Sequence, residues 1–228
     1  PDAWLQRIFP TPCGTLILED RLDGIRTDPK GCNPVRVVIT ASAIDSKKRG
    51  ATWRQVLDPW VRHVAAASQH LRLTTIVIGT KGLAKLHPLD AEQASTLLGE
   101  WMIAFAEGLQ VPLPVAPELA FEVLPKFTGE VADEKLKNAL LRKYVGDGFQ
   151  EGLVDRDPCL RRAFPDFGTF WQPTTFWRLS RCLYERLLEA AELVDHDQAG
   201  ELDGAGQPGS AQPANTQVRK GRKPGKTR

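Results

Sequence analysis

The sequence lacks any apolar run close to the roughly 20 residues that a membrane-spanning helix needs, and no signal peptide opens it. It also lacks the phosphate-binding motifs G-x-x-x-x-G-K-[ST] and G-x-G-x-x-G, the zinc-protease motif H-E-x-x-H and the hydrolase motif G-x-S-x-G. These absences exclude nucleotide hydrolysis by a P-loop in this chain. They predict a soluble, intracellular protein.

Cysteine is scarce, and no C-x-x-C pair occurs. The four cysteines stand alone in the sequence: Cys13, Cys32, Cys159 and Cys182. The four histidines have no spacing typical of metal ligands: His63, His70, His87 and His196. We therefore expect reduced thiols, no metal site and histidines at the surface or at the edges of elements.

The chain contains enough apolar sequence for one hydrophobic core. It has 228 residues, of which 42% are apolar and 25% are charged. A compact chain of this length buries roughly 70% of its unfolded surface. Because the chain begins at Pro1 within apolar sequence, we expect it to be part of a longer protein.

Basic charge is concentrated at the carboxyl end. The last ten residues carry six Lys or Arg and no acid, which leaves a net charge of −4 for residues 1–218 out of the total of +2. Residues 195–228 are rich in Gly, Ala, Gln and Pro, so we predict a domain over 1–194 and a disordered tail over 195–228. The tail's DNA-binding candidates are Arg219, Lys220, Arg222 and Lys223. A merely solubilising tail is the alternative.

The first third of the chain predicts strands around one helix. Strands are expected within 14–26, at 35–44 as a buried strand, and at 73–79. A helical apolar stripe covers 53–68, with a restart or a kink at Pro59 capped by Asp58. The order strand, helix, strand implies a right-handed crossover and a sheet that is at least partly parallel.

The remainder predicts mainly helices. Asp90 and Gln93 form a capping-box pattern before a helix that ends near Gly108. Residues 111–117 carry three prolines and predict an extended connection, and further helices are expected at 133–145 and 174–194. The aromatic stretch at 164–177 and the proline-rich stretch at 111–117 are either docking surfaces or coverings of the core.

A three-residue pattern resembles the acids and lysine of restriction-type nucleases. Asp23 is followed 22 residues later by Asp45-Ser46-Lys47, which matches D…(D/E)-x-K. Such a site needs two carboxylates on one Mg²⁺ and a lysine beside the attacked phosphate. The second acid and the lysine must lie on the buried strand, where 39–42 offer only Ile, Thr, Ala and Ser. We therefore favour an inactive site and keep an active nuclease that uses Asp23, Asp45 and Lys47 as the alternative.

Several ordered motifs resemble the C-terminal domains of RecC, the gamma subunit of the RecBCD enzyme (exodeoxyribonuclease V). The longest are H-P-L-D-A-E-Q-A-S-T-L-L-G-E-W at 87–101 and F-A-E-G-L-Q-V-P-L-P-V-A-P at 105–117. Supporting segments lie at 60–64, 118–124, 136–149, 157–164 and 176–188. The resemblance spans about residues 14–193 and leaves the tail without a counterpart.

The resemblance implies an α/β fold of the restriction-endonuclease-like PD-(D/E)xK type, with a mixed sheet, flanking helices, a helical C-terminal part and a degenerate active site. It implies a noncatalytic module of a bacterial cytoplasmic complex that contributes to complex assembly and to DNA strand separation and guidance in double-strand break repair. RecB-like and RecD-like subunits, a double-stranded DNA end and the separated single strands are the implied partners, without a membrane. No cofactor is implied in this domain, since ATP and Mg²⁺ act elsewhere in the complex. A third hypothesis is an independent DNA-binding domain that acts through the basic tail.

Overall fold

The computed structural model describes residues 2–27, 34–45, 49–127 and 134–195. The predicted tail lies outside these residues, apart from Asp195. Cys32, Lys47 and His196 also lie outside them. Of the described helices, none combines the length and the apolar character that a membrane crossing requires.

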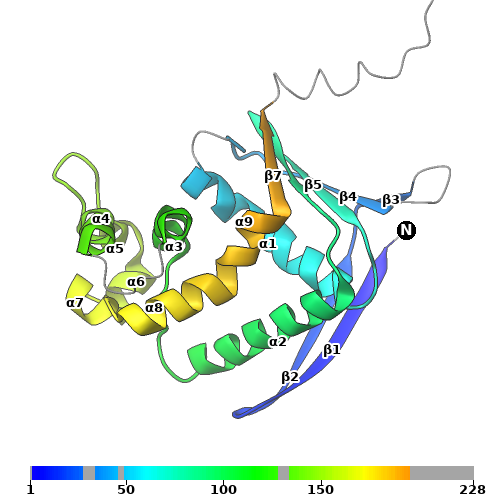
Figure 1. Ribbon diagram of the computed structural model, residues 1–228, viewed down its shortest axis with the longest axis horizontal. Coiled ribbons are helices and arrows are strands. Elements are labelled where there is room, and N and C mark those ends of the chain that lie inside the picture. The colour runs from blue at the N-terminus through cyan, green and yellow to red at the C-terminus, as the bar shows by residue number, and fades with distance from the viewer. Residues whose placement is uncertain (1, 28–33, 46–48, 128–133, 196–228) are drawn as a thin grey trace, which may run out of the picture.

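The chain opens with a long antiparallel ribbon of β1 (Ala3–Thr11) and β2 (Gly14–Leu22). One face of the ribbon buries Leu5 and Phe9 against the core, and Figure 1 shows the ribbon running beside α2 (Ala91–Gly108). The Arg7 guanidinium donates to the Ser95 hydroxyl of α2 at 2.8 Å. The structure confirms a strand within 14–26, whereas β1 was not expected.

A mixed sheet of five strands forms the centre of the fold, in the order β3-β4-β5-β6-β7. The bounds of its strands are β3 Ile25–Thr27, β4 Pro34–Ile39, β5 Thr74–Ile78, β6 Gly82–Leu86 and β7 Ala191–Asp195. β4 and β5 are parallel, and the other neighbours are antiparallel. The expected partly parallel sheet is therefore confirmed.

One face of the sheet is packed and the other is more open. The helices gather on one side of the sheet in Figure 1. On β5, Thr75 and Val77 are buried whereas the alternate Ile76 and Ile78 are only half-buried. The expected strand over 35–44 is confirmed at 35–39, but its end and its burial were wrong, because β4 ends at Ile39, which is 81% exposed.

Helix α1 (Arg49–Ala67) connects β4 to β5 and runs without interruption through Pro59. Of the expected restart or kink at this proline, the restart was wrong. Proline lacks the amide that would bond to the carbonyl of Gln55. Gln55 is exposed, so water can replace this bond without breaking the helix.

Helix α2 begins where the sequence predicted. The Asp90 carboxylate caps it by accepting from the amides of Glu92 and Gln93 at 3.0 and 3.1 Å. Its expected apolar face is only partly covered, because Phe105 and Leu109 are 56% and 61% exposed. The connection after α2 contains neither helix nor strand until α3 begins at Pro117, as predicted.

The C-terminal half is helical and then returns to the sheet. Its elements are α3 Pro117–Val123, η1 Leu124–Lys126, α4 Glu134–Val145, α5 Leu153–Arg156, α6 Pro158–Ala163, α7 Phe167–Phe170, α8 Pro173–Ser180, the π-helical η2 Arg181–Glu185 and α9 Arg186–Ala190. The expected helix over 174–194 is wrong at its end, because residues 191–195 form β7. Antiparallel pairing with β6 outweighs the helical pattern there.

The aromatic stretch belongs to the core. Phe164, Phe167, Phe170, Phe176 and Trp177 are all less than 9% exposed. The ring centroids of Phe170 and Phe176 lie 6.0 Å apart in an edge arrangement. Of the two alternatives for 164–177, a docking surface is therefore wrong for these five rings. They form part of the hydrophobic core of the helical half.

Candidate functional site

Asp23 lies at the bend where the chain leaves the ribbon and enters the central sheet. Gly24 follows it with φ +72°, and a Cβ at this position would come 2.8 Å from the Val37 carbonyl oxygen. The Val37 amide donates to the Gly24 carbonyl at 3.1 Å, and Ile25 pairs with Arg36. The same antiparallel register places Asp23 opposite Val38 on β4.

Among the described residues, Asp23 forms an ion pair with Arg36 on β4. The Arg36 Nη2 atom lies 3.7 Å from Asp23 Oδ1, and its Nε donates to the Asp23 carbonyl at 3.2 Å. Arg36 is 3% exposed and its Nη1 is buried without a hydrogen-bond partner among the described residues. Burial lowers the pKa of this guanidinium, and the nearby Arg62 lowers it further.

Asp45 lies on the other side of β4, in the irregular segment that precedes α1. Its backbone exchanges two hydrogen bonds with the Thr52 hydroxyl at 3.0 and 2.8 Å, and its carboxylate lies 3.7 Å from Lys81 Nζ. The preceding residue, Ile44, packs directly against Gly79. A Cβ added to Gly79 would lie 2.7 Å from the amide nitrogen of Ile44. Asp45 is therefore placed over the turn between β5 and β6.

The structure thus places the two candidate carboxylates near different strands. Asp23 flanks β4 from the side of β3, whereas Asp45 lies beyond β5. With neighbouring strands about 4.8 Å apart, the two are on the order of 10 Å from each other. Two oxygen ligands of one Mg²⁺ must each lie about 2.1 Å from the ion. Lys47 lies outside the described residues, and within them no group of three or more His, Cys, Asp or Glu could hold a metal ion.

A buried polar layer between α1 and the sheet was not anticipated. His63 is 1% exposed, which overturns its expected place at the surface or an edge. Its Nε2 lies 3.0 Å from the His87 carbonyl and its Nδ1 lies 3.0 Å from the Thr75 hydroxyl. Burial lowers the pKa of His63 to about 4. Thr75 faces Arg36 across β4 and β5.

Ion pairs extend this layer toward the ribbon. Arg62 Nε lies 3.3 Å from Asp20 of β2 and 3.4 Å from Asp58 of α1. The ion pair of Asp58 and Arg62 could have been predicted from the sequence, because the two residues are four positions apart on a helix. The ion pair of Arg62 with Asp20 could not, because it joins elements that are distant in the sequence. The tail candidates Arg219, Lys220, Arg222 and Lys223 lie outside the described residues.

The comparisons with known proteins point to one family. The family model described as the RecC C-terminal domain matches residues 6–128, which is more than half of the chain. The match covers most of the ribbon, together with α1, α2 and the first four strands of the central sheet. No curated protein matches the chain.

Proposed function

Because the chain belongs to the family of RecC C-terminal domains, we propose that it is a noncatalytic module of the RecC subunit of a RecBCD complex. In this proposal it contributes to assembly of the complex and to separation and guidance of DNA strands in double-strand break repair by recombination. Its partners are RecB-like and RecD-like subunits, a double-stranded DNA end and the separated strands. The complex acts in the bacterial cytoplasm.

The observation that carries the noncatalytic role is the pairing of Asp23 with β4. On β4 the side chain that pairs with Asp23 is that of Arg36, and Val38 lies opposite Asp23. A nuclease of this type needs a carboxylate and a lysine on this strand, and because β4 ends at Ile39, most of the expected positions 39–42 lie beyond it. The guanidinium of Arg36 presents positive charge to Asp23, and such a group repels a metal ion. The module therefore needs no cofactor of its own, while ATP and Mg²⁺ serve other parts of the complex.

The connectivity of the central sheet supports a restriction-endonuclease-like fold for this module. A hairpin of β3 and β4 is followed by α1 and the parallel strand β5. This arrangement would place an acid at the start of β3 and the acid-x-lysine pair on β4. We propose residues 1–194 as this nuclease-like domain and 195–228 as a separate basic tail, whose first residue, Asp195, still belongs to β7.

The test is a reconstituted complex of this chain, within its full RecC subunit, with RecB-like and RecD-like subunits. We expect the triple variant Asp23→Ala, Asp45→Ala, Lys47→Ala to leave Mg²⁺-dependent DNA cleavage and ATP-driven unwinding at wild-type rates. Omitting the domain should reduce unwinding or prevent assembly, measured by a strand-displacement assay and by size-exclusion chromatography.

The competing nuclease hypothesis makes the opposite prediction. If the 228-residue chain alone cleaves DNA with Mg²⁺ or Mn²⁺ and Asp23→Ala or Asp45→Ala abolishes this cleavage, the module is an enzyme. Asp155→Ala, which removes an exposed carboxylate of α5, is the matched control. Deletion of 195–228 tests the tail, because DNA binding through the tail would be lost together with most of its salt dependence.

A further inference from the structure

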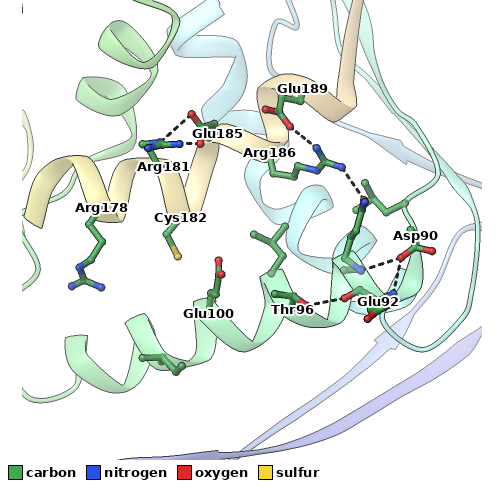
Figure 2. Close-up of a pocket in the computed structure, with 15 residues that line it drawn as sticks. Asp90, Glu92, Thr96, Glu100, Arg178, Arg181, Cys182, Glu185, Arg186 and Glu189 are labelled. Carbon is green, nitrogen blue, oxygen red and sulfur yellow. Dashed lines mark hydrogen bonds and ion pairs between the residues drawn. The ribbon is translucent and has the colours of Figure 1, made fainter. Parts of the chain in front are cut away.

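A groove runs between α2 and the continuous helical segment formed by α8, η2 and α9. Its volume is about 960 Å³. Figure 2 shows side chains from both helical segments projecting into it. We call it the α2–α9 groove. It lies apart from Asp23, Arg36 and Asp45, and none of these three residues lines it.

Three contacts hold the two walls of the groove at a fixed spacing. At one end Arg186 donates to Gln93 at 2.9 Å, and at the other Arg178 donates to Glu107 at 2.8 Å. In the middle the indole of Trp101 donates to the Cys182 carbonyl at 2.8 Å. Cys182 lies in the π-helical η2, and π-helical turns are rare and frequent at functional sites. The groove is therefore preformed, and a ligand need not pay to order it.

Each wall is one face of a helix. Most of the lining residues of α2 recur at a spacing of three or four residues: Glu92, Gln93, Ala94, Thr96, Leu97, Glu100 and Ile103. The lining residues of the opposite wall follow the same spacing: Arg178, Arg181, Cys182, Glu185, Arg186 and Glu189. Two such faces side by side present ridges between which a third helix can pack. Leu97 is half-buried and Ile103 is 46% exposed, so apolar surface is open to such a helix.

The charge of the groove is uneven and negative. Five carboxylates and three guanidinium groups line it, a net charge of −2. The guanidinium groups are paired, Arg181 with Glu185 and Arg186 with Glu189, among others. On α2, Glu92 and Glu100 form no ion pair with any described residue. They are eight residues apart, about 12 Å along the helix.

We propose that the α2–α9 groove binds an amphipathic helix of a partner protein, whose apolar stripe packs on Leu97 and Ile103 and whose Lys or Arg side chains pair with Glu92 and Glu100. A helix laid in a groove is a common mode of peptide recognition. Nucleic acid is disfavoured as the occupant, because the net charge of the groove repels phosphate. Residues 219–228 contain no Leu, Ile, Val, Met or aromatic side chain to cover Leu97 and Ile103, so the chain's own basic end is not the occupant.

The test uses the full 228-residue chain and two fluorescein-labelled helical peptides of equal length with the same leucine stripe. One peptide carries Lys and the other Glu beside the stripe, seven residues apart. Fluorescence anisotropy should show binding of the Lys peptide at least 10-fold tighter than of the Glu peptide. The double variant Glu92→Lys, Glu100→Lys should reverse this preference. Glu151→Lys with Asp155→Lys, which makes the same charge change at exposed sites outside the groove, should leave the preference unchanged.

A second readout locates the bound peptide. Cys182 lines the groove, whereas Cys13 and Cys159 are exposed elsewhere. Burial raises the pKa of the Cys182 thiol, so maleimide labelling is performed at alkaline pH. The Lys peptide should slow labelling of Cys182 several-fold and leave the labelling of Cys13 and Cys159 unchanged.

Three results would overturn the proposal. They are equal binding of both peptides, unchanged labelling of Cys182, and an unchanged preference in the Glu92→Lys, Glu100→Lys variant. Tighter peptide binding after deletion of 196–228 would identify the chain's own tail as the occupant instead. None of these results bears on the DNA cleavage assay above, so failure here leaves the proposed function untouched.

Discussion

The buried imidazole of His63 should make the stability of the protein depend on pH. Its Nε2 faces a carbonyl, that of His87, at 3.0 Å, and a carbonyl can only accept. Nε2 therefore carries the proton, and in the neutral ring Nδ1 accepts from the Thr75 hydroxyl. The charged groups that face the ring are Arg36 and, when protonated, His87, and both oppose a second proton.

The pKa of His63 falls from 6.5 to about 4 on folding, chiefly because of burial. The unfolded chain therefore binds a proton more readily than the native protein, and stability is lost as the pH falls below 6.5. The loss is about 2 kcal/mol between pH 7 and pH 5 and levels off below pH 4, at roughly 3 kcal/mol.

Urea unfolding of the full chain at pH 7, 6, 5 and 4.5 measures this loss. His63→Gln removes the titrating ring, so the variant is less stable at pH 7 but loses about 2 kcal/mol less than wild type on acidification to pH 5. His70→Asn is the control, because this exposed residue has φ +63° and asparagine tolerates that conformation. Parallel pH curves for wild type and His63→Gln would refute the reasoning.

Substitutions at three further sites, measured by urea unfolding, test a close backbone contact, a helix cap and a core ring. Gly79→Ala should lower the free energy of unfolding by about 2 kcal/mol, because the new Cβ would lie 2.5 Å from a side-chain carbon of Ile44. Gly99→Ala, inside α2 with open space around it, should raise the free energy of unfolding by roughly 0.5–1 kcal/mol. Equal effects of the two changes would contradict this packing. Asp90→Ala should lower the free energy of unfolding by about 1 kcal/mol, because it removes the cap of α2. Asp90→Asn should keep most of the stability, because asparagine also caps helices. Phe170→Ala, at a fully buried ring, should cost about 3–5 kcal/mol, and a loss below 1 kcal/mol would contradict its place in the core.

Local sequence signals correctly located the elements whose ends are marked by capping residues or prolines. Asp90 and Gln93 marked the start of α2, and the prolines excluded a helix at 111–116, before α3 begins at Pro117. Only half of the capping box forms, because the Gln93 side chain accepts from Arg186 instead of reaching back to residue 90. This bond joins residues 93 positions apart, and no local pattern contains it.

Elements defined by long-range pairing were missed or misread. The short strand β6 and the last strand β7 pair with each other, although more than 100 residues separate them in the sequence. The apolar residues of 191–194 fit the helical stripe of the preceding segment, so only the free edge of β6 decides that they form a strand. His63 was misjudged for a similar reason, since its partner Thr75 lies on β5, across the crossover from α1.

The placement of Asp45 shows why spacing alone is a poor guide to a metal site. Alternate residues share a face only while the chain remains a strand. The Thr40 hydroxyl accepts from the Ser42 amide at 3.2 Å, and the chain turns after Ile39 to cross over Gly79. The alternation of side chains along β4 therefore does not predict the direction of a side chain beyond that turn. This holds whatever the spacing in sequence from Asp23. On β4 itself Val38 lies opposite Asp23, and the charged side chain that reaches Asp23 is that of the buried Arg36. The residue type at position 36 therefore determines which charge Asp23 meets.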